Sequence, residues 1–136
     1  MKQLIFFICL LGLATACNNG SAELKALQDE VNATHDAAMK TMADMNRVAR
    51  SIKETVKADS LSEEQLAQIM PVLKTIGDAE NDMMNWMANY SEPTDKPAGE
   101  AKKYLQEQLE LIKKNQEDML NATKAAKQFL PGDIQE

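Results

Sequence analysis

Residues 35–45, HDAAMKTMADM, lie at the centre of a long helical pattern. Throughout residues 22–57, apolar side chains recur at alternating steps of three and four. A repeat of this kind, sustained over several heptads, is typical of a helix that packs as in a coiled coil. The pattern predicts one helix over this segment and places His35 and Met42 on its buried stripe.

The same periodicity predicts two further helices, over residues 63–90 and 98–130, joined by short turns. Aromatic residues make up only 4% of the chain, and no β-branched run alternates with polar residues, so no strand is expected. Three long helices with short turns pack as an antiparallel up-down-up bundle. We therefore predict an all-α, coiled-coil-like three-helix bundle over residues 22–130, followed by a disordered tail over residues 131–136.

Two local signals mark the second helix. Ser62 and Gln65 have the spacing of a capping box, which predicts the helix start. Pro71 lies inside the helical pattern, where a proline removes one backbone hydrogen bond. We expect a kink or a break near residues 67–71.

Residues 1–16 have the anatomy of a cleaved lipoprotein signal peptide. Lys2 supplies the positive start, and an apolar run of about ten residues, too short for a stable transmembrane anchor, leads to the small residues ATA before Cys17. In such signals the cysteine is lipidated and becomes the first residue of the mature chain. Residues 17–21 would then be the lipidated cysteine and a short tether. The alternative is an ordinary secretory signal followed by a cysteine by chance.

The residues after Cys17 indicate a location. Asn18 stands where an aspartate would favour retention in the inner membrane, and no acidic block for export to the cell surface follows. By analogy with other lipoproteins, we expect the protein to face the periplasm from the outer membrane. Cys9 leaves with the signal, so the mature chain would contain no disulfide. The formal net charge of −6 argues against nucleic acid as a partner.

Residues 35–45 contain three methionines, and a second methionine cluster, MMNWM, occurs at residues 83–87. If the chain reverses near residues 59–60, His35 lies level with this cluster. Thioether and imidazole groups both suit Cu(I), so the two clusters suggest a soft-metal site, with Trp86 as a shield if it points inward. Its candidate ligands are His35, Met39, Met42, Met84 and Met87.

Core packing explains the same residues without a metal. Methionine fills irregular cores, and a histidine on a buried stripe is usually hydrogen-bonded within the core. Glu80 lies on the inward stripe of the second helix, so we predict a buried polar pair between His35 and Glu80 that fixes the helix register. In this interpretation the protein has no cofactor.

Catalysis is not expected. The chain has one histidine, no thiol after the signal and no glycine-rich phosphate loop. We therefore predict a non-enzymatic, membrane-anchored periplasmic lipoprotein whose bundle has a structural role or binds an envelope protein. The alternative function is Cu(I) binding.

Three stretches carry a family resemblance: HD at residues 35–36 with Met39 and Met42, MMNWMANY at residues 83–90, and EDML at residues 117–120. They resemble a family of small Bacteroidota-type lipoproteins of unknown function, sometimes labelled "viral A-type inclusion protein". The resemblance covers most of the mature chain. It implies a helical fold and a lipid anchor, and it implies no activity.

Overall fold

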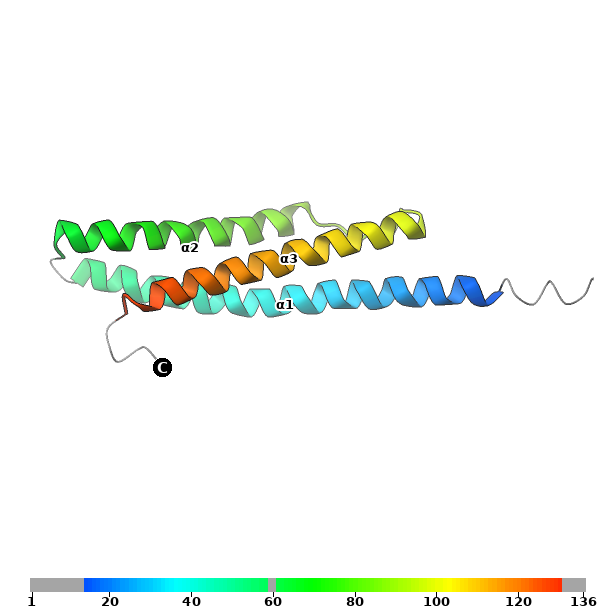
Figure 1. Cartoon of the computed structure of the whole chain (residues 1–136), viewed down its shortest axis with the longest axis horizontal. Helices are drawn as coiled ribbons and strands as arrows, with labels where there is room; N and C mark the ends of the chain where they lie inside the picture. Colours follow the sequence, from blue (N-terminus) through cyan, green and yellow to red (C-terminus); the bar gives the residue numbers. More distant parts are fainter. Residues whose placement is uncertain (1–13, 59–60, 131–136) are drawn as a thin grey trace, which may run out of the picture.

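A computed structural model describes residues 14–58 and 61–130, and Figure 1 shows three long helices packed side by side. They are α1 (Ala14–Ala58), α2 (Glu63–Asn89) and α3 (Ala98–Lys127), and the described residues contain no strand. The predicted all-α three-helix bundle is confirmed. The predicted tail at residues 131–136 and nearly all of the predicted signal peptide lie outside the described residues.

Contacts between side chains show that α1 and α2 run in opposite directions. Gln28 on α1 reaches Tyr90 at the end of α2, with Nε2 donating to the phenol oxygen at 2.5 Å. Further along α1, Asn46 Nδ2 donates to Glu80 Oε1 at 2.9 Å. Residue numbers rise on α1 as they fall on α2, so the pair is antiparallel.

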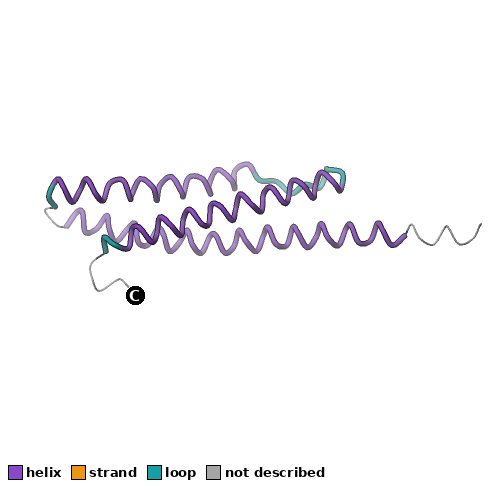
Figure 2. Tube along the Cα trace, in the orientation of Figure 1, coloured by secondary structure: helices purple, strands orange, loops and turns teal. Residues whose placement is uncertain are grey.

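The third helix runs parallel to α1 and packs against both partners. The Lys102 ammonium lies 2.5 Å from Glu23, and Gln116 Nε2 donates to the Thr41 hydroxyl at 3.3 Å. Figure 2 shows the start of α2 at one end of the bundle and the loop between α2 and α3 at the other, as an up-down-up path requires. Contacts of α3 with α1 are the most extensive, and those between α1 and α2 are the fewest.

Methionine and small aliphatic side chains fill the core between the helices. Met45, Met83 and Met119 have no exposed surface, and Ile112 has none either. Burying apolar surface of this kind is the main favourable contribution to folding. Two predicted stripes meet in this core as expected, because Met42 and Met45 of α1 and Met83 of α2 all face inward.

The second helix begins where its capping signal predicts. The Ser62 hydroxyl accepts the Gln65 backbone N–H at 3.2 Å, and the Ser62 N–H donates to Gln65 Oε1 at 2.9 Å. The helix then continues through Pro71 to Asn89, so the predicted possibility of a break at Pro71 is wrong. Pro71 is exposed, and a proline ring on the outer face of a helix displaces no core side chain.

The first helix begins earlier than the sequence pattern predicts. The start expected at residue 22 is too late, and residues 17–21, predicted to be a tether, belong to α1. No proline interrupts this segment, and Gly20 costs only about 1 kcal/mol in a helix interior. Extending an existing helix is far easier than starting one, so α1 continues through these residues.

No helix in the described part of the chain is long and apolar enough to cross a membrane.

Candidate functional site

Four rings, from His35, Trp86, Tyr90 and Tyr104, form a column at the end of the bundle where α2 turns into α3. We call this column the aromatic ladder. It contains the only histidine, the only tryptophan and both tyrosines of the chain. Ring centroids are 5.5 Å apart for His35 and Trp86, 4.7 Å for Trp86 and Tyr90, and 6.2 Å for the two tyrosines. The tyrosine and tryptophan planes differ by 20° or less, as in stacked rings.

Helix geometry explains why these rings meet. Trp86 and Tyr90 are four residues apart, which places both rings on one face of α2. Tyr90 is the C-cap of that helix, and its backbone N–H donates to the Trp86 carbonyl oxygen. His35 comes from α1 and Tyr104 from α3, so the ladder connects all three helices.

The polar atoms of the tryptophan and the tyrosines have partners. Trp86 Nε1 donates to Gln108 Oε1 at 2.9 Å, and the Ser91 backbone N–H donates to the Tyr104 oxygen at 3.2 Å. Lys96 lies over the Tyr104 ring, with its ammonium 5.7 Å from the centroid. The sequence analysis did not identify Gln108 as the partner of Trp86, because this half-buried glutamine lies outside the apolar stripe of α3 and carries no other signal.

His35 differs from the other ladder residues. Its Nε2 atom is buried and has no hydrogen-bond partner within residues 14–58 and 61–130. Its Nδ1 atom lies 3.5 Å from an Asp36 carboxylate oxygen. A buried polar atom without a partner loses its hydration and gains nothing in return. His35 is therefore the one ladder residue whose position core packing does not explain.

The predicted pair between His35 and Glu80 is not formed. Glu80 accepts from Asn46 instead, as the antiparallel contacts above show. Asn46 follows His35 by about 16 Å along α1, at 1.5 Å per residue. At this level of the bundle, Glu80 therefore pairs with Asn46 of α1, and both side chains are half-buried.

The predicted metal ligands lie at different depths. Met42 is buried, and Met39 and Met87 are half-buried against the core. Met84 is 50% exposed, because its neighbour Met83 takes the inward position and successive helical residues point about 100° apart. In the described part of the chain, no three His, Cys, Asp or Glu side chains are placed to hold a metal ion. A site at His35 would therefore depend on thioethers.

Burial changes the acidity of Tyr90 in the ladder. Removal from water raises the pKa of the Tyr90 phenol above 10.0, the hydrogen bond from Gln28 lowers it, and the negative charges of Glu92 and ionised Tyr104 raise it further. The folded chain therefore holds this proton more tightly than the unfolded chain does.

We expect alkaline pH to destabilise the bundle through Tyr90. A raised pKa in the folded state contributes stability that is present in full below pH 10 and is lost as pH rises through the raised pKa. Urea unfolding from pH 8 to about pH 11 measures this loss. Tyr90→Phe should show a shallower decline than the wild type over this range, and equal slopes would contradict the assignment.

Comparisons with protein-family models, with curated proteins and with solved structures find no match to this chain. The family resemblance drawn from the sequence therefore stays a prediction.

Proposed function

We propose that the protein is a non-enzymatic lipoprotein, anchored through Cys17 in the outer membrane and facing the periplasm. Its helical bundle has a structural role or binds another protein of the bacterial envelope. We also propose that the protein belongs to the family of small Bacteroidota-type lipoproteins that its sequence resembles. It includes no catalytic step, because the ladder gathers rings and amides and places no nucleophile beside a base.

The observation that carries this proposal is the continuity of α1. The helix runs without interruption from Ala14 to Ala58, so the Cys17 position lies on the same helix as the α1 residues of the bundle. Cys17 precedes Gln28, the first α1 contact of the ladder, by about 16 Å along the axis. A lipid at Cys17 would hold the ladder end close to the membrane surface.

Interhelical contacts brace this same end of α1. Lys102 pairs with Glu23, and the Lys113 ammonium lies 3.4 Å from Glu30. Exposed ion pairs contribute little individually, but together with the bond between Gln28 and Tyr90 they join the start of α1 to the other two helices. Such bracing suits a domain that presents a surface at a fixed height above a membrane.

Lipid labelling and fractionation in a Gram-negative host test the anchor. The wild type should incorporate a labelled fatty acid and fractionate with outer membranes, and protease added to intact cells should leave it uncut. Cys17→Ser should abolish both the label and the membrane association. Cys9→Ser is the matched control, because it removes the other cysteine and should change neither result. Lipid label that persists in Cys17→Ser would refute the proposal.

The unpartnered Nε2 atom of His35 favours Cu(I) binding as a second candidate function. An imidazole nitrogen without a hydrogen bond is available as a ligand. Met39 and Met42 follow on the same helix, and Met87 faces the core from α2. Their thioethers are the soft donors that Cu(I) prefers, and together with His35 they would hold the ion.

Anaerobic titration with Cu(I) against a competing chelator tests this candidate. We expect one ion per chain and its loss in His35→Ala. Met84→Leu should bind as the wild type does, because Met84 lies on the outer side of α2. Equal affinity of the wild type and His35→Ala would exclude His35 as a ligand. The Nε2 atom would then be a buried polar atom whose lost hydration no hydrogen bond replaces.

A further inference from the structure

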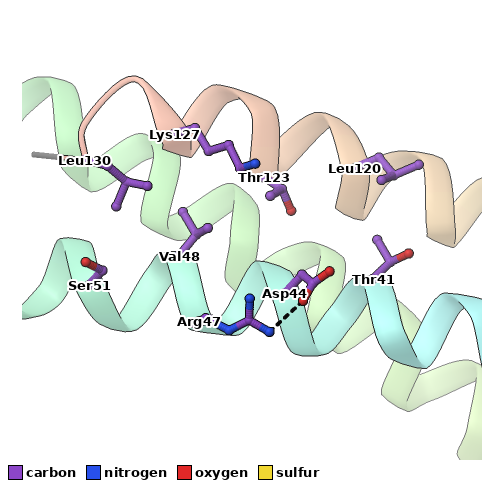
Figure 3. Close-up of a pocket in the computed structure, with 9 residues that line it drawn as sticks. All are labelled: Thr41, Asp44, Arg47, Val48, Ser51, Leu120, Thr123, Lys127 and Leu130. Atoms are coloured by element: carbon purple, nitrogen blue, oxygen red, sulfur yellow. Dashed lines mark hydrogen bonds and ion pairs between the residues drawn. The ribbon is translucent and has the colours of Figure 1, made fainter. Parts of the chain in front are cut away.

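A groove of about 520 Å³ runs between α1 and α3 at the end of the bundle opposite the aromatic ladder. Figure 3 shows Val48 from α1 and Leu130 from the turn after α3 pointing into it. Leu120 of α3 lines the groove and is 53% exposed. This volume lies within the range of small-molecule sites, and the apolar residues leave a surface that a ligand would cover favourably.

Cations stand on both sides of this apolar surface. Arg47 of α1 and Lys127 of α3 line the groove, as Figure 3 shows. Asp44 is the only acid among the lining residues, and it pairs with Arg47 at 2.7 Å. That pair is exposed and therefore weak. Lys127 makes no ion pair within the described ranges, so the lining carries a net positive charge in a chain of net charge −6.

Helix ends explain only part of this charge. A lysine in the last turn of α3, as Lys127 is, compensates the helix dipole. Arg47 lies about three turns before the end of α1, where the dipole effect has faded. Arg47 pairs with Asp44 on its own helix, so Lys127 is the cation of the lining that has no ion pair within the described residues. A cation of this kind beside an apolar groove suits a ligand that has both an acidic group and an apolar chain.

We infer that this groove binds an anionic amphiphile of the fatty-acid class. The acyl chain would lie on Val48, Leu120 and Leu130, and the carboxylate would pair with Lys127. Arg47 is the other cation of the lining. The inference is independent of the lipid anchor and of His35, because the groove shares no residue with either. A neutral or cationic amphiphile of the same length would lack the ion pair.

Calorimetric titration of the purified protein with dodecanoate tests the inference. The protein carries Cys17→Ser so that no attached lipid competes, and the ligand stays below its micelle-forming concentration. We expect one dodecanoate per chain. Dodecyltrimethylammonium, which has the same chain and the opposite charge, should bind at least about tenfold more weakly, as the loss of one charge-assisted contact predicts.

Two exposed leucines on α3 provide a matched pair of variants. Leu120→Glu should reduce dodecanoate binding at least about tenfold, because it places a charge on the apolar surface. Leu111→Glu alters a leucine that is 48% exposed outside the groove and should leave binding unchanged. Both positions are exposed, so both variants should melt close to the wild type. Lys127→Gln should weaken dodecanoate binding and reduce its dependence on salt.

Other occupants of the groove would overturn the inference. If the protein forms a concentration-dependent dimer that Leu120→Glu dissociates, the groove is an interface between two copies. If dodecanoate binds only after residues 131–136 are removed, the groove is the seat of that segment. Equal binding of the two amphiphiles, or equal loss in the two leucine variants, would show adsorption without a site.

Discussion

Replacing Trp86 with alanine is expected to lower the free energy of unfolding by about 3–5 kcal/mol, the range for a large buried aromatic side chain. Trp86 is only 9% exposed and stands between His35 and Tyr90 in the aromatic ladder. Its removal would leave a cavity, unstack two rings and deprive Gln108 of its donor. Urea denaturation followed by circular dichroism measures the change, since the variant has lost the only tryptophan and with it the usual fluorescence signal.

Two further variants test the hydrogen bond of Trp86 and the effect of a substitution on the exposed side of α2. Trp86→Phe keeps a ring in the ladder and loses the hydrogen bond to Gln108, so we expect a cost of about 1 kcal/mol beyond that of the smaller ring. Met84→Ala, two residues away on the exposed side of α2, should stay within about 0.5 kcal/mol of the wild type. A loss below about 1 kcal/mol in Trp86→Ala would mean that the ladder does not stabilise the fold.

The bounds of α2 and α3 could be predicted because local chemistry sets them. The capping box at Ser62 fixes the start of α2, and the turn SEPTDKP ends that helix and precedes the next. α2 ends at Asn89, one position before its predicted end at residue 90. α3 begins at Ala98 as predicted but ends at Lys127, three positions before its predicted end at residue 130. The largest error is the start of α1, which was expected at residue 22 and lies at Ala14.

The buried face of α3 includes positions that an apolar stripe does not identify. Asn115 and Ala122 are buried, and their neighbours Gln116 and Thr123 are half-buried. α3 packs against both other helices, so its buried face is wider than a single stripe. Asn115 donates to the Asp82 carbonyl oxygen at 3.4 Å, a contact with α2 that no apolar pattern reveals.

The sequence predicted part of the aromatic ladder, namely the position of His35 relative to α2. Placing His35 level with residues 83–87 correctly brought it to Trp86. The pairing of His35 with Glu80 failed because it depended on the rotation of two helices about their axes, which no residue spacing specifies. Sequence reasoning could also have placed the two tyrosines together, since Tyr90 and Tyr104 lie on either side of the same turn.

Replacing Pro71 with alanine is expected to raise the free energy of unfolding by about 2 kcal/mol. A proline in a helix interior costs about 3 kcal/mol, because it lacks the N–H that would donate to the carbonyl four residues earlier, here that of Ala67. Up to about 1 kcal/mol is returned when proline restricts the unfolded chain, and the substitution loses that benefit. Pro71 is exposed, so little packing is lost, and urea denaturation measures the gain.

Pro97 provides the matched control. It is also exposed, but it stands at the N-cap of α3, where its carbonyl oxygen accepts the Ala101 N–H and a missing donor breaks no helical bond. Pro97→Ala should therefore leave stability unchanged or lower it by up to about 1 kcal/mol. A gain at Pro71 and none at Pro97 would locate the cost in the missing hydrogen bond. A loss at Pro71 would instead mean that α2 needs the proline for its packing, which its exposed ring argues against.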